Sequence, residues 1–178
     1  MEGARTEPIY FGALRPGRDA AVRLVLVSSK GHKSNPKEVL ARLQDWARKN
    51  GLRKGDEGWL IIDRDEFSEL ELDAVCAEAA RCGYHVAMSN PCFELWLWLH
   101  VRENRPFLGS THCQKELGKI LPDYSKGKYD PEALLKIGGH LAIKRASALD
   151  LNPDEAWPRV QSTRVYRLCQ RIFPHLFP

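Results

Sequence analysis

The chain has 178 residues, of which 43% are hydrophobic and 28% are charged. This length leaves room for one domain with a sizeable core, and the composition excludes a globally disordered chain. The formal net charge of +4 is compatible with a polyanionic partner, although many proteins with such a charge bind none.

The first half of the chain alternates between strand and helix patterns. Short apolar runs rich in β-formers predict strands at residues 22–28, 58–63 and 84–88. Between them, apolar residues at helical spacing predict helices at residues 36–49 and 68–80. The order strand, helix, strand, helix, strand implies right-handed crossovers and a mainly parallel sheet flanked by helices.

Local signals mark where these two helices begin and end. Asn35 and Ser68 are N-cap residues of the preferred type, directly before the first and the second helical pattern. Asn50-Gly51 is a stop signal for the first helix.

The second half of the chain is predicted to be helical. Residues 93–101 (FELWLWLHV) are too apolar for a solvated surface helix, so we expect this segment to pack against the sheet. Further helices are predicted at 112–121, 131–149 and 155–173. We interpret residues 1–178 as a single α/β domain with a helical C-terminal third.

An acidic group directly follows the second predicted strand. Asp63, Asp65 and Glu66 fall beyond its carboxyl end, which is where open α/β sheets bind ligands. Asp63 and Asp65 can point the same way from an extended backbone, and two such carboxylates suit Mg²⁺. The alternative is a solvated strand end whose aspartates cap the next helix.

A basic loop follows the first predicted strand and precedes a helix N-terminus. Lys30, His32 and Lys33 could contact phosphate there, although the P-loop spacing is absent and an ordinary solvated loop is the alternative. A second basic surface could come from the C-terminal helices, although such charges more often belong to an ordinary solvated helix face. Its candidate residues are Lys144, Arg145, Arg159, Arg164 and Arg167.

Several residues with polar or reactive side chains lie in or near the segment that follows the third predicted strand. Asn90 and Glu94 are candidate substrate-binding residues, with helix capping as the alternative for Asn90. Glu94 is expensive to bury in an apolar helix without a partner, so we expect it to face the site or to pair with an arginine. His100 could shuttle protons but is more often a satisfied core histidine. A Cys92 nucleophile with His85 or His100 has no recognisable pairing motif.

The cysteines and the hydropathy of the sequence indicate the cellular compartment. The five cysteines are an odd number with no CxxC pair, which favours reduced thiols over disulfides or zinc. No apolar run approaches the length of a membrane span, and the N-terminus lacks the apolar core of a secretory signal. We therefore expect a cytoplasmic protein with no membrane partner.

The first residues offer a carboxylate and a turn, Glu2-Gly3 and then Thr6-Glu7-Pro8. A frayed terminus is the default expectation for such a segment.

Three segments together resemble the RloB-like family: EGARTEPIYF at 2–11, IDRDEF at 62–67 and SNPCFELWLWLH at 89–100. Their order and spacing match over nearly the whole chain, and the third segment is the most specific. The family is encoded beside restriction-modification and other phage-defence genes. It is regarded as related to the Toprim domains of topoisomerases, primases and nucleases. The resemblance implies a Toprim-like fold and a role in phage defence.

The resemblance also implies roles for individual carboxylates. Glu2 matches the Toprim glutamate that acts as acid/base or metal ligand, while Asp63 and Asp65 match the aspartates that hold Mg²⁺, or Mn²⁺ in its place. Family members carry an apolar strand before this glutamate, whereas here Met1 immediately precedes Glu2. We therefore expect the first Toprim strand to be truncated, with Glu66 as the other candidate for the third acidic group.

Two hypotheses about function follow. The first is a Mg²⁺-dependent nuclease that cleaves DNA or RNA, with Asp63 and Asp65 as metal ligands, Glu2 or Glu66 as the third acidic group, and residues 30–33 as phosphate contacts. The second is a catalytically weak Toprim-like module that binds nucleic acid, a nucleotide or an ATPase encoded nearby. The truncated first strand favours the second.

Overall fold

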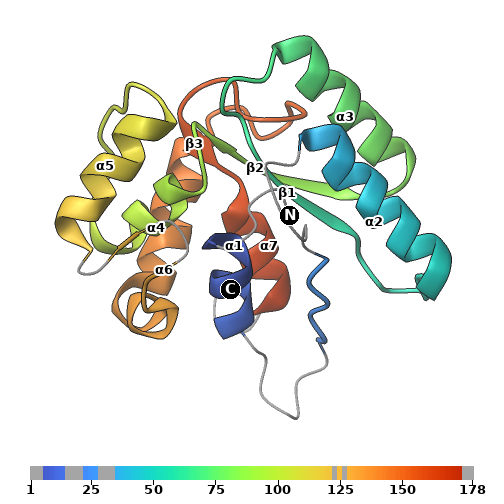
Figure 1. Cartoon of the computed structure of the whole chain (residues 1–178), viewed down its shortest axis with the longest axis horizontal. Coiled ribbons are helices and arrows are strands. Elements are labelled where there is room, and N and C mark those ends of the chain that lie inside the picture. Colours follow the sequence, from blue (N-terminus) through green and yellow to red (C-terminus); the bar gives the residue numbers. More distant parts are fainter. Residues whose placement is uncertain (1–5, 15–21, 28–34, 122–123, 126–127, 174–178) are drawn as a thin grey trace.

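A computed structural model gives the arrangement of the chain as a three-layer α/β structure (Figure 1). It describes residues 6–14, 22–27, 35–121, 124–125 and 128–173. A small sheet lies between two groups of helices, which is the layering that the strand-helix alternation predicts. The prediction of an α/β fold is confirmed at this level.

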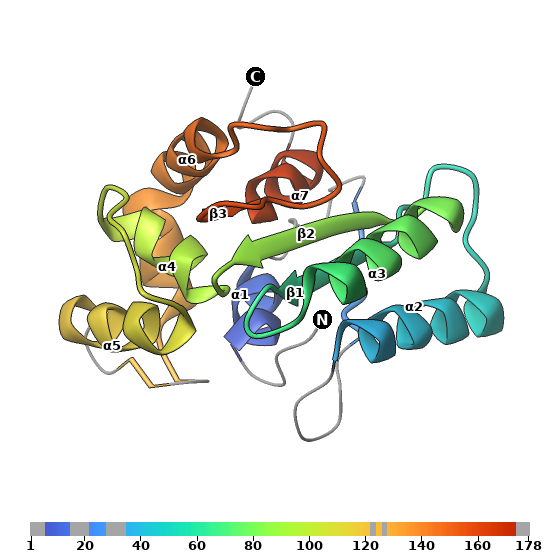
Figure 2. The same cartoon turned by 90° about the horizontal axis from the view of Figure 1, so that it is seen from above.

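The described elements are short, and most are helices. In chain order they are α1 (Thr6–Ala13), α2 (Pro36–Asn50), β1 (Trp59–Asp63), α3 (Glu69–Arg81), β2 (His85–Asn90), α4 (Glu94–Val101), α5 (Ser110–Ile120), α6 (Pro131–Leu149), β3 (Ser162–Thr163) and α7 (Val165–Ile172). The helices α2 and α3 cover one face of the sheet, and the others gather on its opposite side and beyond its end (Figure 2).

The sheet has the order β1-β2-β3. β1 and β2 are parallel, with Trp59 opposite His85 and Asp63 opposite Ser89. β3 is antiparallel to β2 and contributes two residues. The predicted parallel pairing is thus present, in a smaller and mixed sheet.

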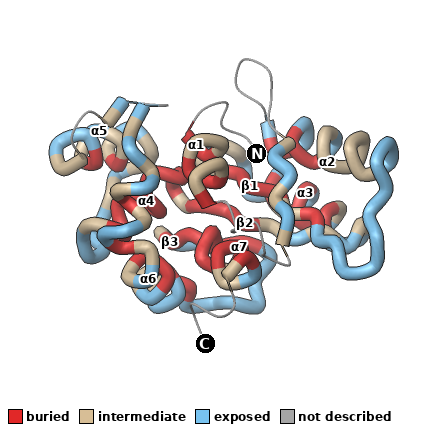
Figure 3. Tube along the Cα trace, turned by 90° about the horizontal axis from the view of Figure 1, so that it is seen from below, coloured by how far each residue is buried: buried red, intermediate tan, exposed pale blue. Residues whose placement is uncertain are grey.

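Alternate residues of β1 enter two different apolar clusters. Leu60 and Ile62 pack with the apolar sides of α2 and α3, whereas Ile61 packs with the helices of the other layer. This period of two is the expected alternation of side chains along a strand. Because both faces are covered by helices, the strand is apolar throughout, as its sequence predicts. Figure 3 shows the buried residues concentrated where the layers meet.

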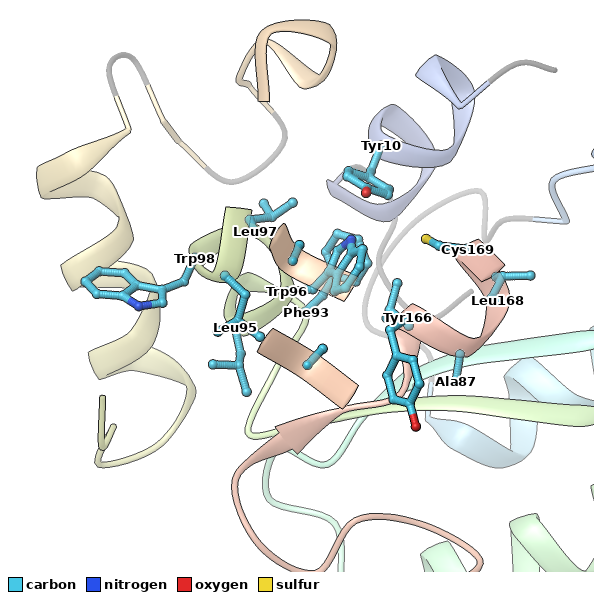
Figure 4. Packing of buried hydrophobic residues seen from close by; sticks show 14 of the residues in the cluster. Tyr10, Ala87, Phe93, Leu95, Trp96, Leu97, Trp98, Tyr166, Leu168 and Cys169 are labelled. Atoms are coloured by element: carbon cyan, nitrogen blue, oxygen red, sulfur yellow. The ribbon is translucent and has the colours of Figure 1, made fainter. Parts of the chain in front are cut away.

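Helix α4 lies within the larger cluster. Every residue from Glu94 to His100 is buried, which agrees with the prediction that this segment is not a solvated surface helix. Phe93 and Trp96 lie on the side of Tyr10 from α1, while Trp98 points away from them (Figure 4). The large aromatic side chains thus fix α4 from more than one direction.

The predicted helix ends around α2 and α3 are confirmed. Asn35 accepts a hydrogen bond from the Glu38 backbone N–H, and Gly51, with φ 72°, ends α2. Ser68 forms a reciprocal capping box with Glu71 at the start of α3. Short-range polar signals therefore set these boundaries correctly.

The strand predicted at residues 22–28 is wrong. Val22–Val27 belongs to no strand, and Val25 and Leu26 are 48% and 39% exposed. Figure 1 shows the segment as an extended trace below β1. The composition favours a strand, but hydrogen-bonded pairing decides whether one forms, and among the described residues the sheet consists of β1, β2 and β3.

The helix predicted at 155–173 is also wrong in its first half. Only Val165–Ile172 is helical, and the preceding residues form a loop and β3. A buried ion pair anchors this loop, because the Arg164 guanidinium donates to Asp150 at 3.1 Å and also to the Asn152 carbonyl at 2.8 Å. The loop in turn places Trp157 in the cluster beside α3.

The expectation of a frayed start is corrected by α1. Thr6 and Glu7 are buried, and so are Tyr10 and Phe11 one turn later. The buried residues recur one turn apart, so one side of α1 packs on the core. Within the described part of the chain, no helix has the length and apolar character that a membrane span requires.

His100, near the end of α4, is a buried neutral imidazole. Its Nδ1 lies 2.9 Å from the Trp96 carbonyl, which can only accept, so Nδ1 carries the proton. Its Nε2, 3.0 Å from the Tyr10 hydroxyl, then accepts from that group. Burial lowers the pKa of His100 from 6.5 to about 4. The histidine is therefore a satisfied core residue.

The close approach of α6 to α4 gives a first prediction. Gly138 has non-helical angles inside α6, and an added Cβ would lie 1.9 Å from the His100 carbonyl oxygen. Because backbone would have to move, Gly138→Ala should lower the free energy of unfolding by about 3 kcal/mol or more. Gly139→Ala, whose Cβ would meet only Leu135 at 3.8 Å, is the matched control and should be neutral or stabilising. Equal effects in urea unfolding would contradict this account.

The buried imidazole gives a second prediction. In the unfolded chain His100 takes up a proton near pH 6.5, whereas in the folded chain it does so only near pH 4. The free energy of unfolding should therefore fall as the pH falls through this window. The loss should approach about 3 kcal/mol and level off below pH 4. His100→Gln should flatten this slope, whereas His140→Gln at an exposed position should not. Urea unfolding at a series of pH values measures it.

Candidate functional site

The predicted acidic group lies at the carboxyl ends of β1 and β2. Asp63 is the last residue of β1 and pairs in register with Ser89 of β2. The chain then stays close to β2, because the Arg64 N–H donates to the Ser89 carbonyl at 2.8 Å. The pairing of the two parallel strands therefore fixes the position of Asp63, the first residue of the acidic group.

Asp65 leaves the strand conformation. Its φ is 40°, and its N–H donates to the Pro91 carbonyl at 3.1 Å. The expectation that Asp63 and Asp65 project from one extended backbone is therefore wrong, because a turn begins at Asp65. The Ser110 hydroxyl, on the first residue of α5, donates a short hydrogen bond to the Asp65 carboxylate. Asp65 is thus held between the end of β2 and the start of α5.

Glu94 supplies a buried carboxylate on the first turn of α4. It is 2% exposed and accepts hydrogen bonds from the Tyr124 hydroxyl at 2.8 Å and from Gln114 Nε2 at 3.4 Å. The predicted need for a partner is confirmed, but the partners are neutral donors rather than an arginine. These two donors satisfy a carboxylate that is shielded from water.

Cys92 shows that Asp63 and Glu94 share one electrostatic environment. A hydrogen bond with the Cys113 thiol, burial, and then the charges of Glu94 and Asp63 raise the pKa of Cys92 well above its usual value. A thiol so strongly protonated is a poor nucleophile. His85 stacks on Trp59 at the other end of the strands, and His100 is engaged in the core, so neither pairs with this thiol. All five cysteines are free.

Glu7, from the Thr6-Glu7-Pro8 segment, is a further buried carboxylate, and sequence reasoning did not predict its burial. It is 3% exposed on the first turn of α1. Burial, followed by the charges of Glu7 and Glu94, raises the pKa of Tyr129. Tyr129 in turn donates to the Thr6 carbonyl at 2.8 Å, which ties α1 to this region. The helical pattern Thr6–Glu7–Tyr10–Phe11 was the signal that could have found it.

Several predicted site residues are placed elsewhere or are outside the description. Glu2, Lys30, His32 and Lys33 lie outside the described residues. Glu66 is exposed on the turn after β1. The Asn90 side chain donates to the Pro158 carbonyl at 3.0 Å, so one of its roles is to hold the loop before β3.

The second basic surface is largely neutralised by ion pairs. Arg145 pairs with Glu103, Arg159 with Asp73, and both Arg164 and Arg167 with Asp150; Lys144 is exposed. These arginines hold loops in place, and their charges are matched by carboxylates. The described C-terminal helices therefore present much less free positive charge than their sequence suggests.

The donor chemistry at this edge of the sheet suits a hard cation. Asp63, Asp65 and Glu94 offer carboxylate oxygens, which Mg²⁺ prefers over nitrogen or sulfur. In the part of the chain that the structure describes, no group of three His, Cys, Asp or Glu side chains is arranged to hold a metal ion. Mg²⁺ often uses only one or two carboxylates together with waters and substrate phosphates, so an open two-carboxylate arrangement is compatible with it.

Comparison with known proteins yields one finding. A family model described as RloB-like protein matches residues 1–172. Comparisons with curated proteins and with solved structures gave no match.

The buried contacts of Glu94 give a third prediction. Tyr124→Phe removes the shorter of the two hydrogen bonds to a buried carboxylate and should cost about 1.5–3 kcal/mol of unfolding free energy. Tyr129→Phe, the matched control, removes a bond to a neutral carbonyl and should cost about 0.5–1.5 kcal/mol. In a Glu94→Gln background the Tyr124→Phe cost should shrink. If it stays unchanged in urea unfolding, Glu94 is not the group that Tyr124 stabilises.

Proposed function

Since the chain belongs to the RloB-like protein family, we propose that it is a Mg²⁺-dependent nuclease of the Toprim type that cleaves nucleic-acid phosphodiesters in phage defence. The observation that carries the proposal is the position of Asp63 at the carboxyl end of β1, beside the parallel strand β2, with Asp65 on the turn that follows. Ligands of open α/β sheets bind at this position.

Asp63 and Asp65 are the residues that would hold the ion. Bound there, Mg²⁺ would polarise a phosphoryl oxygen and balance the charge that builds up in phosphodiester cleavage. Mn²⁺ has the same preference for oxygen ligands and could replace it. The protein keeps Asp65 in place through Ser110 and the Pro91 carbonyl, so little rearrangement is needed on binding.

The remaining roles are assigned by charge and exposure. Glu66 is exposed beside the two aspartates and, like Glu2, is a candidate for the acid/base that handles a proton. Glu94, which is buried and accepts from Tyr124 and Gln114, is proposed to favour the bound cation through its carboxylate. Lys30, His32 and Lys33 are proposed as contacts to phosphates of DNA or RNA.

A second candidate is favoured by the engagement of Asp65. Its carboxylate already accepts from Ser110 at the start of α5, which would serve a structural role equally well. The chain would then be a catalytically weak Toprim-like module that binds nucleic acid, a nucleotide or an ATPase encoded nearby. The two candidates differ in whether a divalent cation binds between Asp63 and Asp65.

The fourth prediction separates these candidates. Asp63→Asn and Asp65→Asn keep the side-chain volume but remove the charge that a hard cation needs, so each should lower Mg²⁺- or Mn²⁺-dependent cleavage roughly 1000-fold or more. Their unfolding free energies should change little or rise, because neutralising one carboxylate relieves repulsion. Asp154→Asn, at an exposed position, should leave activity unchanged.

The measurement is cleavage of a panel of DNA and RNA substrates with either metal, with and without neighbouring gene products. Calorimetric titration of Mn²⁺ accompanies it. If the wild-type protein and both variants are equally inactive and no metal binds, the nuclease proposal fails and the binding module stands.

A further inference from the structure

Arg64 separates the two aspartates of the acidic group, and its backbone is held on both sides. Its N–H donates to the Ser89 carbonyl of β2 at 2.8 Å, one residue beyond the end of β1. Its carbonyl accepts from the Phe67 N–H at 3.2 Å, which closes the turn that carries Asp65 and Glu66. The backbone of Arg64 is therefore fixed at the carboxyl end of the two parallel strands.

The side chain of Arg64 is held by the same turn. Its Nη1 donates to the Asp65 carbonyl at 2.9 Å, so the guanidinium lies beside a residue that is proposed to hold the metal. Nε and Nη2 have no hydrogen-bond partner among the described residues, and neither atom is enclosed by the protein. Because a guanidinium carries five N–H donors, most of its donors remain available to a ligand.

The charge of Arg64 is also unmatched. Although three acidic residues are its neighbours in sequence, no ion pair joins its guanidinium to a carboxylate of the described residues. Most arginines in the described ranges do have such a partner, namely Arg48, Arg81, Arg105, Arg145, Arg159, Arg164, Arg167 and Arg171. Arg64 is thus a positioned cation whose charge is left free beside the acidic group.

We propose that Arg64 binds a phosphate group of the nucleic-acid substrate, next to the phosphodiester that the metal would polarise. The inference rests on the proposed function and names a substrate-binding residue for it. A guanidinium suits phosphate because two parallel N–H donors can bind two oxygens of one phosphate group. The bond to the Asp65 carbonyl holds the group in place before the substrate arrives.

Electrostatics explains why a cation is needed at this position. The other residues of 63–66 are all acidic, so they repel a polyanion before a metal binds. Bound Mg²⁺ would cancel the charge of two aspartates, and a fixed guanidinium then adds attraction for a phosphate. The arrangement therefore favours a polyanionic substrate over a neutral or cationic one.

The alternative is that Arg64 only fastens the turn through the Asp65 carbonyl. The two roles predict different effects on the binding of a metal ion. If Arg64 only fastens the turn, its loss should loosen Asp65 and weaken the binding of Mn²⁺. If Arg64 is a phosphate contact, the loss of a nearby positive charge should leave the affinity for Mn²⁺ unchanged or raise it.

The experiment uses the full chain, with Arg64→Gln as the variant and Arg102→Gln as the matched control. Glutamine loses the charge but keeps an N–H donor for the Asp65 carbonyl. Arg102 likewise donates from Nη1 to a neighbouring backbone carbonyl, at 3.0 Å, but it follows the far end of α4. Fluorescence anisotropy measures the binding of a labelled single-stranded DNA and an RNA of the same sequence, with Ca²⁺ replacing Mg²⁺, at several salt concentrations. Calorimetry measures the affinity for Mn²⁺.

Arg64→Gln should weaken oligonucleotide binding about tenfold, because it removes a charge-assisted contact. It should also flatten the slope of log affinity against log salt by about 0.7, the value for one phosphate contact with a single strand. Arg64→Lys, which keeps the charge but not the planar fork, should retain the slope and recover part of the affinity. Arg102→Gln should change neither quantity, and no variant should bind Mn²⁺ more weakly than the wild-type protein.

Several results would overturn the proposal. They are the absence of oligonucleotide binding, an unchanged affinity and salt slope in Arg64→Gln, and weaker Mn²⁺ binding in that variant. Arg64-dependent binding of ATP without binding of the oligonucleotides would overturn nucleic acid as the source of the phosphate. A wild-type protein that cleaves nothing, but loses oligonucleotide affinity through Arg64→Gln, would keep the phosphate contact and lose the nuclease function. Cleavage that depends on Asp63 but binding that ignores Arg64 would do the reverse.

Discussion

A helix buried on every side is the constraint on which the arrangement depends. Every residue of α4 from Glu94 to His100 is buried, so other elements must cover the helix on all sides. α6 approaches it most closely, with Gly138 against the His100 backbone, and α1 closes another side through Tyr10. Burying a polar atom without a partner is costly, and side chains from α1, α5 and the loop before α6 supply partners to His100 and Glu94.

The same constraint shapes the candidate site. Three residues separate the end of β2 from the start of α4, so Glu94 is necessarily close to the strand end that carries Asp63. Packing of α5 against α4 then brings Ser110 to Asp65. The packing around a buried helix therefore helps to set the positions of Asp65 and Glu94. Burial that keeps Glu94 dry would also strengthen its interaction with a cation at the rim.

Local signals predicted much of this arrangement. The caps Asn35 and Ser68 and the burial of α4 depend on short-range sequence patterns and are confirmed. The strand at 22–28 failed because pairing depends on a neighbour that composition cannot supply, and the helix at 155–164 failed because the Arg164–Asp150 pair holds a loop there. The turn at Asp65 was also out of reach, since it is set by contacts with Pro91 and Ser110, distant in sequence. The assignments of metal and substrate residues remain predictions.

The two aspartates after β1 are held by different contacts. Asp63 is the last residue of β1 and is placed by the parallel pairing with Ser89 of β2. Asp65 lies outside the strand, and its position depends on the Pro91 carbonyl and on the Ser110 hydroxyl at the start of α5. A change in the packing of α5 should therefore move Asp65 and leave Asp63 in place, because strand pairing does not depend on α5.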